Sequence, residues 1–390
     1  MERIYLDYAA TTPTDPQVTE AMQPYFFDKF GNPSSIHSFG QEAKKAMEDA
    51  RSKVASFLGA KEDEIIFTSG GTESDNFALL GVLWANSVKG NHVITTAIEH
   101  HAILEPLHFL EKQGVEVTYV KPDQYGMVAL EDIAQAITPK TVLISVMHAN
   151  NEIGTIQPIK EIGRLAREKG VYFHTDAVQT VGHVPVDVGD LNVDLLSLSA
   201  HKFYGPKGVG CLYARKGTRL LPYLRGGGQE RRRRASTENI PGIVGLGKAI
   251  ELCKEKMGIE MKEQARLRDK FIAEIPKRID RVYLNGHPVQ RLPNNVNFSI
   301  EYIEGESMLL NLDMLGIAAS TGSACTSGDL EPSHVLLSIG RPHELCHGSL
   351  RLSLGRYTQE KEIDRFLEVF PKIVSKLRAM SPLTDAKEGA

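Results

Sequence analysis

The fold of this chain is decided by two stretches, Val171-Tyr-Phe-His-Thr-Asp-Ala-Val-Gln179 and Leu195-Leu-Ser-Leu-Ser-Ala-His-Lys-Phe-Tyr-Gly-Pro-Lys-Gly208. The first places Asp176 at the end of an apolar strand, and the second places Ser199 at the end of the next strand with Lys202 just beyond it. Open α/β sheets bind their ligands beyond the carboxyl ends of their strands. Asp176 and Lys202 are therefore expected to lie at a ligand site on one edge of such a sheet.

An aspartate and a lysine in this arrangement are the two groups that pyridoxal phosphate chemistry needs. The lysine amine forms a Schiff base with the cofactor aldehyde, and the carboxylate keeps the pyridine nitrogen protonated so that the ring accepts electrons. Taken singly, an Asp after a strand is more often a cap or turn residue, and a Lys in such a turn is usually a solvated charge. Here Gln179, Ser199 and His201 accompany the pair. That combination predicts a cofactor site.

Apolar strand-like runs alternate with helical periodicity from about Ile65 to Tyr213. The runs cover residues 65–67, 92–96, 115–120, 142–147, 171–173 and 195–198. One intervening helix has proline near its start at Pro158 and glycine at its end at Gly170, as helix termini prefer. This alternation predicts an α/β fold in which a mostly parallel sheet is flanked by helices.

A different pattern follows the glycine turn 226–228 and the arginine run after it. We expect a long helix over about 242–275, a strand over 295–300, a helix over about 306–315 and a last helix from Thr358. The chain is therefore predicted to form a large α/β domain over 14–255. A smaller α+β domain would combine 1–13 with 256–383, and the tail 384–390 would be disordered.

Composition restricts the class of protein and its location. The 390 residues are 42% hydrophobic and 24% charged with a net charge of −4, which indicates neither a nucleic-acid partner nor a membrane-surface protein. The first residues contain no apolar signal segment, and no later run is long and uncharged enough to span a bilayer. Cysteines are too few and scattered for a disulfide framework, and no Cys-x-x-Cys pair indicates a metal site. We expect a cytoplasmic protein without a metal.

The turn Ser69-Gly-Gly-Thr-Glu-Ser-Asp-Asn76 follows a strand-like run and opens an apolar helix. Small residues at a helix N-terminus bind phosphate through backbone N–H groups and the helix dipole. A Gly-Gly turn alone is usually only a turn, but this context makes it a candidate. We expect Gly71 and Thr72 to bind the cofactor phosphate, with Ser199 and His201 on its other side.

Two histidines, His100 and His101, lie just past another strand-like run. Neighbouring residues on a helix point in different directions, which argues against a shared metal. An imidazole of His100 stacked on the pyridine ring, where it could also relay protons, is the preferred interpretation. The alternative is a capping or solvated histidine.

Two amide side chains are expected near the same ring. Gln179 lies about one helical turn past Asp176, so that both can face the cofactor, and Gln179 would bind its ring hydroxyl. Asn151 follows a further core strand and would lie near that hydroxyl and the carboxylate of a substrate.

Of the four cysteines, Cys325 stands in the polar, glycine-flanked loop Thr321-Gly-Ser-Ala-Cys-Thr-Ser-Gly-Asp329. A free cysteine is usually buried as a small hydrophobe, which is the expectation for Cys211 and Cys253. For Cys346, which lies near two histidines in the sequence, the sequence does not decide between burial and a reactive role. Cys325 has no apolar neighbours to pack with, so it is the candidate for covalent catalysis by an exposed thiolate.

Several motifs together resemble one family, the cysteine desulfurases of the NifS/IscS branch. They are Tyr5-Leu-Asp-Tyr-Ala-Ala-Thr-Thr12, Gly31-Asn-Pro-Ser-Ser-Ile-His37, the turn 69–73, Met147-His-Ala-Asn-Asn-Glu-Ile-Gly154, Thr175-Asp-Ala-Val-Gln179, Ser199-Ala-His-Lys202 and Gly322-Ser-Ala-Cys-Thr-Ser-Gly328. The resemblance runs from Tyr5 to about Leu383, and the cysteine loop is its most specific part. It implies an aspartate-aminotransferase-like fold, a homodimer, and conversion of L-cysteine to L-alanine with the sulfur left as a cysteine persulfide.

The resemblance also implies roles for individual residues. Lys202 is the Schiff-base lysine, Cys325 carries the persulfide and Arg351 pairs with the substrate carboxylate. The residues implied to hold the pyridoxal phosphate are Thr72, His100, Asn151, Asp176, Gln179, Ser199 and His201.

One further cofactor contact is implied across the dimer, from Thr237 to the partner's phosphate. Thr237 follows the run Arg231-Arg-Arg-Arg-Ala-Ser236, which by itself is typical of a solvated or phosphate-attracting patch. Two positions depart from the family's usual pattern: Ser236 stands where glycine is common, and Tyr8 stands where asparagine is common.

Three alternatives stay open at this point. Another pyridoxal phosphate lyase or aminotransferase, such as a selenocysteine lyase, would share the cofactor site. A non-catalytic scaffold or sulfur-carrier partner would need no intact Asp176 and Lys202 pair. The sulfur acceptor, such as an iron–sulfur scaffold protein for nitrogenase-type or general cluster assembly, or a tRNA-thiolation protein, is not named by the sequence.

Overall fold

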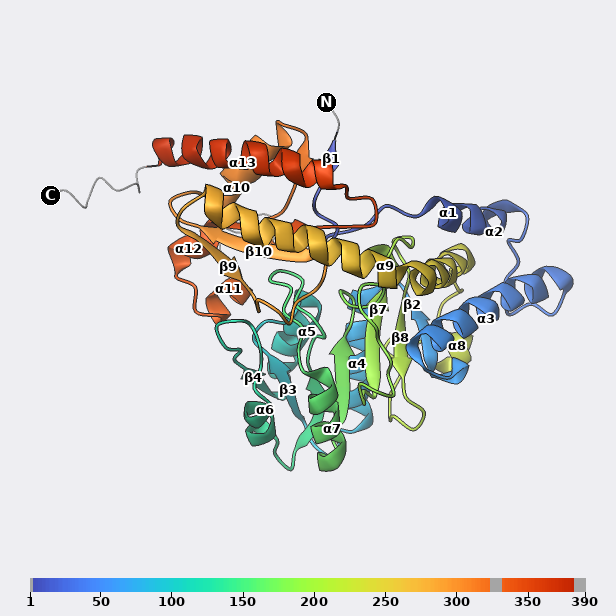
Figure 1. The fold of residues 1–390 in the computed structure, drawn as a ribbon. Coiled ribbons are helices and arrows are strands. Elements are labelled where there is room, and N and C mark those ends of the chain that lie inside the picture. The colour runs from blue at the N-terminus through green and yellow to red at the C-terminus, as the bar shows by residue number, and fades with distance from the viewer. Residues whose placement is uncertain (1–2, 323–331, 382–390) are drawn as a thin grey trace.

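A seven-stranded sheet forms the centre of the molecule in a computed structural model that describes residues 3–322 and 332–381 (Figure 1). In spatial order its strands are β2 (Ile65–Thr68), β8 (Gly210–Ala214), β7 (Leu195–Ser199), β6 (Tyr172–Asp176), β5 (Thr141–Ser145), β3 (His92–Thr96) and β4 (Glu116–Val120). All neighbours are parallel except β8, which runs antiparallel to β2 and β7. The predicted mostly parallel sheet is confirmed.

Alternating strand residues send their side chains to two different cores, because successive side chains of a strand point to opposite faces. In β2, Ile65 and Phe67 pack in one hydrophobic cluster and Ile66 in another. The first cluster includes residues of α3 (Ser38–Leu58), α7 (Ile159–Lys169) and α9 (Ile240–Arg278). The second includes residues of α4 (Gly71–Ala85) and α5 (His101–Glu111). Helices therefore cover both faces of the sheet, as predicted.

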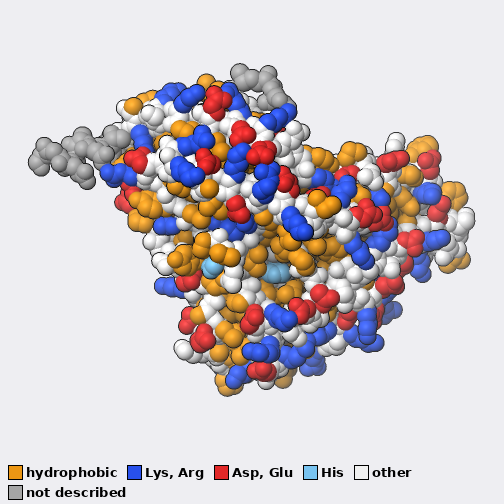
Figure 2. Space-filling model, viewed as in Figure 1, with side chains coloured by type: hydrophobic (Ala, Val, Ile, Leu, Met, Phe, Trp, Pro, Cys, Tyr) orange, Lys and Arg blue, Asp and Glu red, His pale blue; other side chains and the backbone are white. Residues whose placement is uncertain are grey.

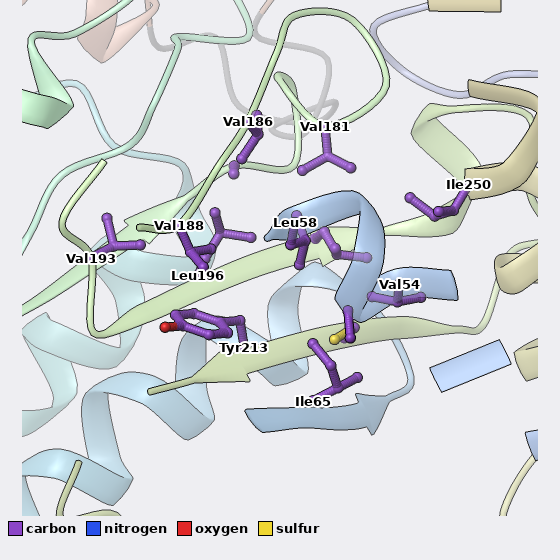
Figure 3. Close-up of a cluster of buried hydrophobic side chains, with 14 of the residues drawn as sticks. Val54, Leu58, Ile65, Val181, Val186, Val188, Val193, Leu196, Tyr213 and Ile250 are labelled. Atoms are coloured by element: carbon purple, nitrogen blue, oxygen red, sulfur yellow. The ribbon is translucent and has the colours of Figure 1, made fainter. Parts of the chain in front are cut away.

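Figure 3 shows part of the first cluster, where segments far apart in the sequence meet. Val54 and Leu58 come from α3, Leu196 and Tyr213 from neighbouring strands, and Ile250 from α9. Fully burying an aliphatic side chain contributes about 1.5–3 kcal/mol. This packing fixes the strands whose ends carry the site.

A third cluster lies around a smaller sheet with the order β12 (Ser349–Ser353), β10 (Asn295–Ile300) and β9 (Val282–Asn285), all antiparallel. Next to it, β1 (Ile4–Tyr5) pairs with β11 (Ile317–Ala318), which brings the N-terminal segment beside the C-terminal part of the chain. The helix α13 (Glu360–Met380) and the second half of α9 pack on this sheet.

The remaining short elements connect these layers. They are α1 (Pro16–Met22), α2 (Pro24–Phe27), α6 (Leu130–Ala136), α8 (Gln229–Arg232), α10 (Gly305–Asp313), α11 (His334–Ser338), α12 (His343–His347) and the 3-10 turns η1 (Glu62–Glu64) and η2 (Ala200–Lys202). No helix within residues 3–322 and 332–381 is long and apolar enough to cross a membrane.

Strand ends are where the structure departs most from the sequence-based expectation. The strand β6 continues past the apolar run 171–173 to Asp176. Its polar residues His174 and Thr175 are fully buried, because the strand is flanked on both sides by parallel neighbours, β5 and β7. Because His174 and Thr175 are polar, a search for hydrophobic runs does not find them, although they belong to the core of the sheet.

Candidate active site

Asp176 is the last residue of β6 and lies beside β7, where it pairs in register with Ser197. Its carboxylate is buried, and one oxygen accepts a hydrogen bond of 2.9 Å from the Val178 N–H. Burial raises the pKa of Asp176 to about 6, against the opposing effects of that hydrogen bond and the Lys202 ammonium. A cationic ring nitrogen placed on this carboxylate would relieve the cost of burying its charge.

Lys202 ends the 3-10 turn η2, which directly follows β7. Its ammonium donates to the backbone carbonyls of Ala9 at 2.7 Å and Ala10 at 2.9 Å. The amide of Gln179 donates to the same Ala9 carbonyl at 3.1 Å. The structure therefore brings Lys202 and Gln179 together, as predicted, at an N-terminal segment that the sequence analysis did not assign to the site.

The phosphate candidate Ser69–Thr72 forms the N-terminus of α4, with Gly70 as the N-cap residue and no side-chain cap. A Cβ atom on Gly71 would lie 2.7 Å from Val178 Cγ2, and one on Gly70 would lie 3.6 Å from Ser199 Oγ. The turn thus packs against the end of β7, and it approaches Val178 too closely for a larger residue at position 71 unless Val178 shifts. Thr72 is exposed, as a ligand contact requires.

Two histidines of the site are held neutral by burial. The pKa of His201 is lowered to about 4, first by desolvation and then by the Lys202 charge, and its Nδ1 lies 3.0 Å from Thr11 Oγ1. The pKa of His100 is also lowered to about 4 by the same two causes in the same order. His100 is the N-cap of α5, because its Nδ1 accepts from the Ala102 N–H at 3.1 Å. The capping interpretation is therefore correct for Nδ1, and the Lys202 interaction places the ring near the site.

Arg351 lies buried in β12. It donates to Asp7 Oδ1 at 2.8 Å and to the Asn151 carbonyl at 3.1 Å. Within the described part of the chain its Nε has no hydrogen-bond partner. Asp7 is a residue that the sequence analysis missed, although it lies inside the quoted motif 5–12. A substrate carboxylate at Arg351 would share the guanidinium with Asp7.

Two buried carboxyls near the site were also missed, Asp75 and Glu99. Burial raises the pKa of Glu99 to about 8, although hydrogen bonds from Met147 N–H and Thr96 Oγ1 lower it. Burial, followed by the neighbouring Asp176 charge, raises the pKa of Asp75 well above its ordinary value. Burial thus shifts both carboxyls toward their protonated form, and no sequence pattern marks a residue for that role.

Three of the four cysteines lie in apolar surroundings. Burial raises the pKa of Cys211 and of Cys253 to about 12 and that of Cys346 to about 11. A thiol of this kind is a poor nucleophile at neutral pH. The predicted burial of Cys211 and Cys253 is confirmed, and Cys346 is buried as well. The candidate nucleophile Cys325 lies outside the described residues.

Thr237 is exposed on the loop before α9, and no contact described for the chain joins it to Asp176 or Lys202. Among residues 3–322 and 332–381, no group of three His, Cys, Asp or Glu side chains could hold a metal ion.

The residues that converge here fit pyridoxal phosphate. A buried carboxylate stands ready for a pyridine nitrogen, a lysine amine lies near it, and a glycine-lined helix N-terminus is packed against the same turn. Asp176, Lys202, Gln179, Ser199 and Gly71 are the residues that carry this fit.

Comparison with known proteins shows the family of this chain. The sequence profile of the family described as aminotransferase class-V matches residues 4–366. The cysteine desulfurase IscS of Dictyoglomus turgidum is 59% identical over 379 residues, covering 97% of this chain and 96% of that protein. Among solved structures, a NifS-like protein has a TM-score of 0.90 at 40% identity and covers 96% of this chain and 100% of its own. SspA in complex with cysteine has a TM-score of 0.82 at 37% identity, with coverages of 91% and 100%.

Fold and site together define a pyridoxal-phosphate-dependent enzyme with an aminotransferase-like architecture. The chain belongs to the aminotransferase class-V family and, within it, to the cysteine desulfurases of the NifS/IscS branch.

Proposed function

We propose that this chain is a cysteine desulfurase that converts L-cysteine to L-alanine and carries the sulfur as a persulfide on Cys325. The observation that carries the proposal is the convergence of Lys202 and Gln179 on one carbonyl, beside the buried Asp176, in a chain so similar to that IscS protein. A non-catalytic scaffold would have no use for this buried charge arrangement.

The cofactor would be held at both of its ends. Its phosphate would lie on the backbone N–H groups of Gly71 and Thr72, with Ser199 and His201 beside it. Its ring would lie between Asp176 and His100, with Gln179 and Asn151 at the ring hydroxyl. When bound, pyridoxal phosphate supplies an electron sink that weakens bonds at the α- and β-carbons of the amino acid.

The chain's own residues do the remaining work. Lys202 would anchor the cofactor through its amine and, once released, take the α-proton of the substrate. His100 is neutral at pH 7 because its pKa is about 4, so it serves as a proton acceptor before it can donate. Arg351 would bind the substrate carboxylate through its guanidinium.

Sulfur transfer needs no external oxidant. As the substrate Cβ–Sγ bond breaks, its electron pair stays with the carbon, which gains a proton and becomes the methyl group of alanine. Cys325 Sγ forms the new S–S bond, so the protein thiol becomes a persulfide. The high pKa values of the three buried cysteines leave Cys325 as the thiol best suited to this step.

The active unit we propose is a homodimer. The segment over α1, α2 and the start of α3 projects from the body of the chain (Figure 1), and Figure 2 shows hydrophobic side chains on that projecting end. Its exposed large side chains are Phe26, Phe27, Phe30, Ile36 and Phe39. Apolar patches of this kind mark interaction surfaces. A second copy covering this end would also place Thr237 of one chain at the cofactor phosphate of the other.

The persulfide would pass to an acceptor protein such as an iron–sulfur scaffold. We place the reaction in the cytoplasm, where reducing conditions keep a catalytic thiol free. A selenocysteine lyase shares the cofactor site, so activity without Cys325 separates the two functions.

The decisive experiment compares wild type with Cys325→Ser after addition of L-cysteine. Wild type should release alanine and gain about one sulfur atom on the peptide that holds Cys325, as single-nucleophile catalysis requires. Cys325→Ser should gain none, because a serine hydroxyl is not ionised at neutral pH. The matched control Cys346→Ser should keep the added sulfur; sulfur mapped to Cys346 would show that the nucleophile is misassigned.

A further inference from the structure

The loop after the glycine turn 226–228 has a strained backbone. Three consecutive residues, Glu230, Arg231 and Arg232, have positive φ angles of 44°, 57° and 64°, and Ser236 follows with 94°. This region is unfavourable for non-glycine residues, because it brings Cβ close to the following carbonyl oxygen. Such strain persists only where surrounding contacts over-determine the backbone, which happens most often at ligand clamps and active sites. Two sets of side-chain contacts hold the backbone of this loop in place.

The first contact is a buried ion pair between Glu230 and Arg51. The Glu230 carboxylate accepts from Arg51 Nη1 at 3.0 Å and Nη2 at 2.6 Å, and both side chains are 2% exposed. The same carboxylate accepts from the Phe67 N–H at 2.9 Å, and Arg51 donates to the Ile65 carbonyl at 2.9 Å. This anchor ties the loop to β2, the strand that leads into the turn Ser69–Thr72.

The second contact joins the same loop to the other side of that turn. Arg234 donates from Nε and Nη2 to the two carboxylate oxygens of Glu73, at 2.8 and 3.0 Å. Glu73 lies in the first turn of α4, and its Oε2 also accepts from the Ser69 N–H at 2.8 Å. Burial raises the pKa of Glu73, but the bonds from Arg234 and Ser69 outweigh it, so that the net shift is downward.

These contacts decide which groups of the turn face a ligand. The Ser69 N–H is taken by Glu73, which leaves the N–H groups at the start of α4 for an anion. A carboxylate at a helix N-terminus competes with a phosphate for the same positive end of the helix dipole. Arg234 neutralises that carboxylate in the two-pronged geometry that arginine favours, so the phosphate does not meet an unpaired negative charge.

We propose that Arg234 and Glu73 form a positioning pair for the phosphate of pyridoxal phosphate, held in register by the Arg51–Glu230 anchor. The pair fixes the turn and cancels the Glu73 charge, and it makes no contact with the reacting atoms. This inference rests on the proposed placement of the cofactor phosphate at Gly71 and Thr72.

The test measures binding of pyridoxal phosphate and of pyridoxal, which lacks the phosphate, to the full-length protein after cofactor removal. Arg234→Met should weaken pyridoxal phosphate at least about tenfold and change pyridoxal less than about twofold, because only the phosphate meets the unpaired carboxylate. The double variant Glu73→Gln with Arg234→Met should regain part of the loss, since the uncompensated charge is gone. Circular dichroism and melting temperature verify that each variant is folded.

Arg233→Met is the matched control, because it removes the same charge from the same loop. The Arg233 guanidinium donates to the Asp63 carbonyl at 2.7 Å and does not contact the turn. An equal loss for both ligands in Arg234→Met, or the same selective loss in Arg233→Met, would overturn the proposal. If wild type itself binds pyridoxal phosphate and pyridoxal equally, the placement of the phosphate at Gly71 and Thr72 fails as well, and that result is distinct from a loss confined to Arg234→Met.

Discussion

At the scale of single residues, burial sets the chemistry of the site more than charge pairing does. Desolvation raises the pKa of Asp176 and lowers those of His100 and His201, so each group is pushed toward its neutral form. The positive charge of Lys202 lowers the pKa of all three groups. The cofactor-free site is thus poised to gain from a ligand that brings a positive ring nitrogen to Asp176.

We expect Lys202→Ala to abolish alanine and sulfide release while the variant still binds pyridoxal phosphate without a covalent link. The amine is both the anchor and the proposed base, whereas the phosphate contacts stay intact. Activity assays and mass spectrometry after borohydride reduction measure the two effects. Lys207→Ala, a lysine of the same turn region, is the control. Unchanged turnover in Lys202→Ala would contradict the cofactor assignment.

The raised pKa of Asp176 also predicts how the cofactor-free protein responds to pH. The folded protein binds this proton more tightly than the unfolded chain, since the pKa rises from 3.8 to about 6. The stabilisation is fully present below the unfolded-state value and is lost as pH rises through about 6.

Wild type should therefore lose stability relative to Asp176→Asn between about pH 4 and about pH 7, by an amount on the order of 1–3 kcal/mol. Urea unfolding of the cofactor-free proteins across this range gives the difference. Asp190→Asn, at an exposed aspartate, is the control variant. A difference that stays flat with pH would mean that Asp176 is not held in this way.

At the scale of elements, α9 connects the two halves of the fold. Its first half contributes Leu246 and Ile250 to the large cluster, and its second half contributes Leu267 and Phe271 to the cluster around the smaller sheet. We propose that these clusters belong to the two predicted domains, 14–255 and 1–13 with 256–383. The boundary between the two domains would then lie within α9, a single continuous helix.

Two substitutions on α9 test this division. Phe271→Ala should cost about 3–5 kcal/mol and Leu246→Ala about 2–5 kcal/mol, because each leaves a cavity in a fully buried position. Hydrogen exchange should rise mainly in β9, β10 and β12 for Phe271→Ala and mainly in β2, β7 and β8 for Leu246→Ala. Ile259→Ala, at a residue 76% exposed on the same helix, should stay within about 0.5 kcal/mol of wild type. The same exchange pattern in both core variants would argue for one cooperative unit.

At the scale of the whole molecule, the projecting apolar end is the feature that a single copy leaves unexplained. Phe27 is 83% exposed and Ile36 is 93% exposed, on a part of the chain that stands away from the central sheet. Burying such side chains against a second copy would remove apolar surface from water at about 25 cal/mol per Å².

We expect Phe27→Ser to shift the protein toward monomer in analytical ultracentrifugation and to lower activity with it. The matched control Ile259→Ser, at an isolated exposed residue, should sediment like wild type.

Mixing Lys202→Ala chains with Thr237→Ala chains should restore one complete site in each hybrid dimer, because each site would take its lysine and its threonine from different chains. Wild type that is fully active as a monomer would contradict the dimer.

The sequence by itself determined the class of fold and named most of the candidate site residues. Alternation of apolar runs and helical periods predicted the parallel sheet because both patterns are local, and strand ends marked by Asp176 and Lys202 predicted the ligand edge. Cys325 was selected by its polar neighbours, which are also local. Residues such as Gly71 could be chosen because a tight turn before a helix leaves a readable motif.

Only the tertiary structure decided what depends on contacts between distant segments. The Ala9 carbonyl at Lys202, the Asp7 carboxylate at Arg351 and the Glu230 carboxylate at Arg51 join parts of the chain that no spacing rule connects. Burial likewise decided the protonation of Glu99, whose side chain looks like a surface acid in the sequence. Local patterns fix which residues are available, whereas desolvation and long-range pairing exist only once the chain has folded.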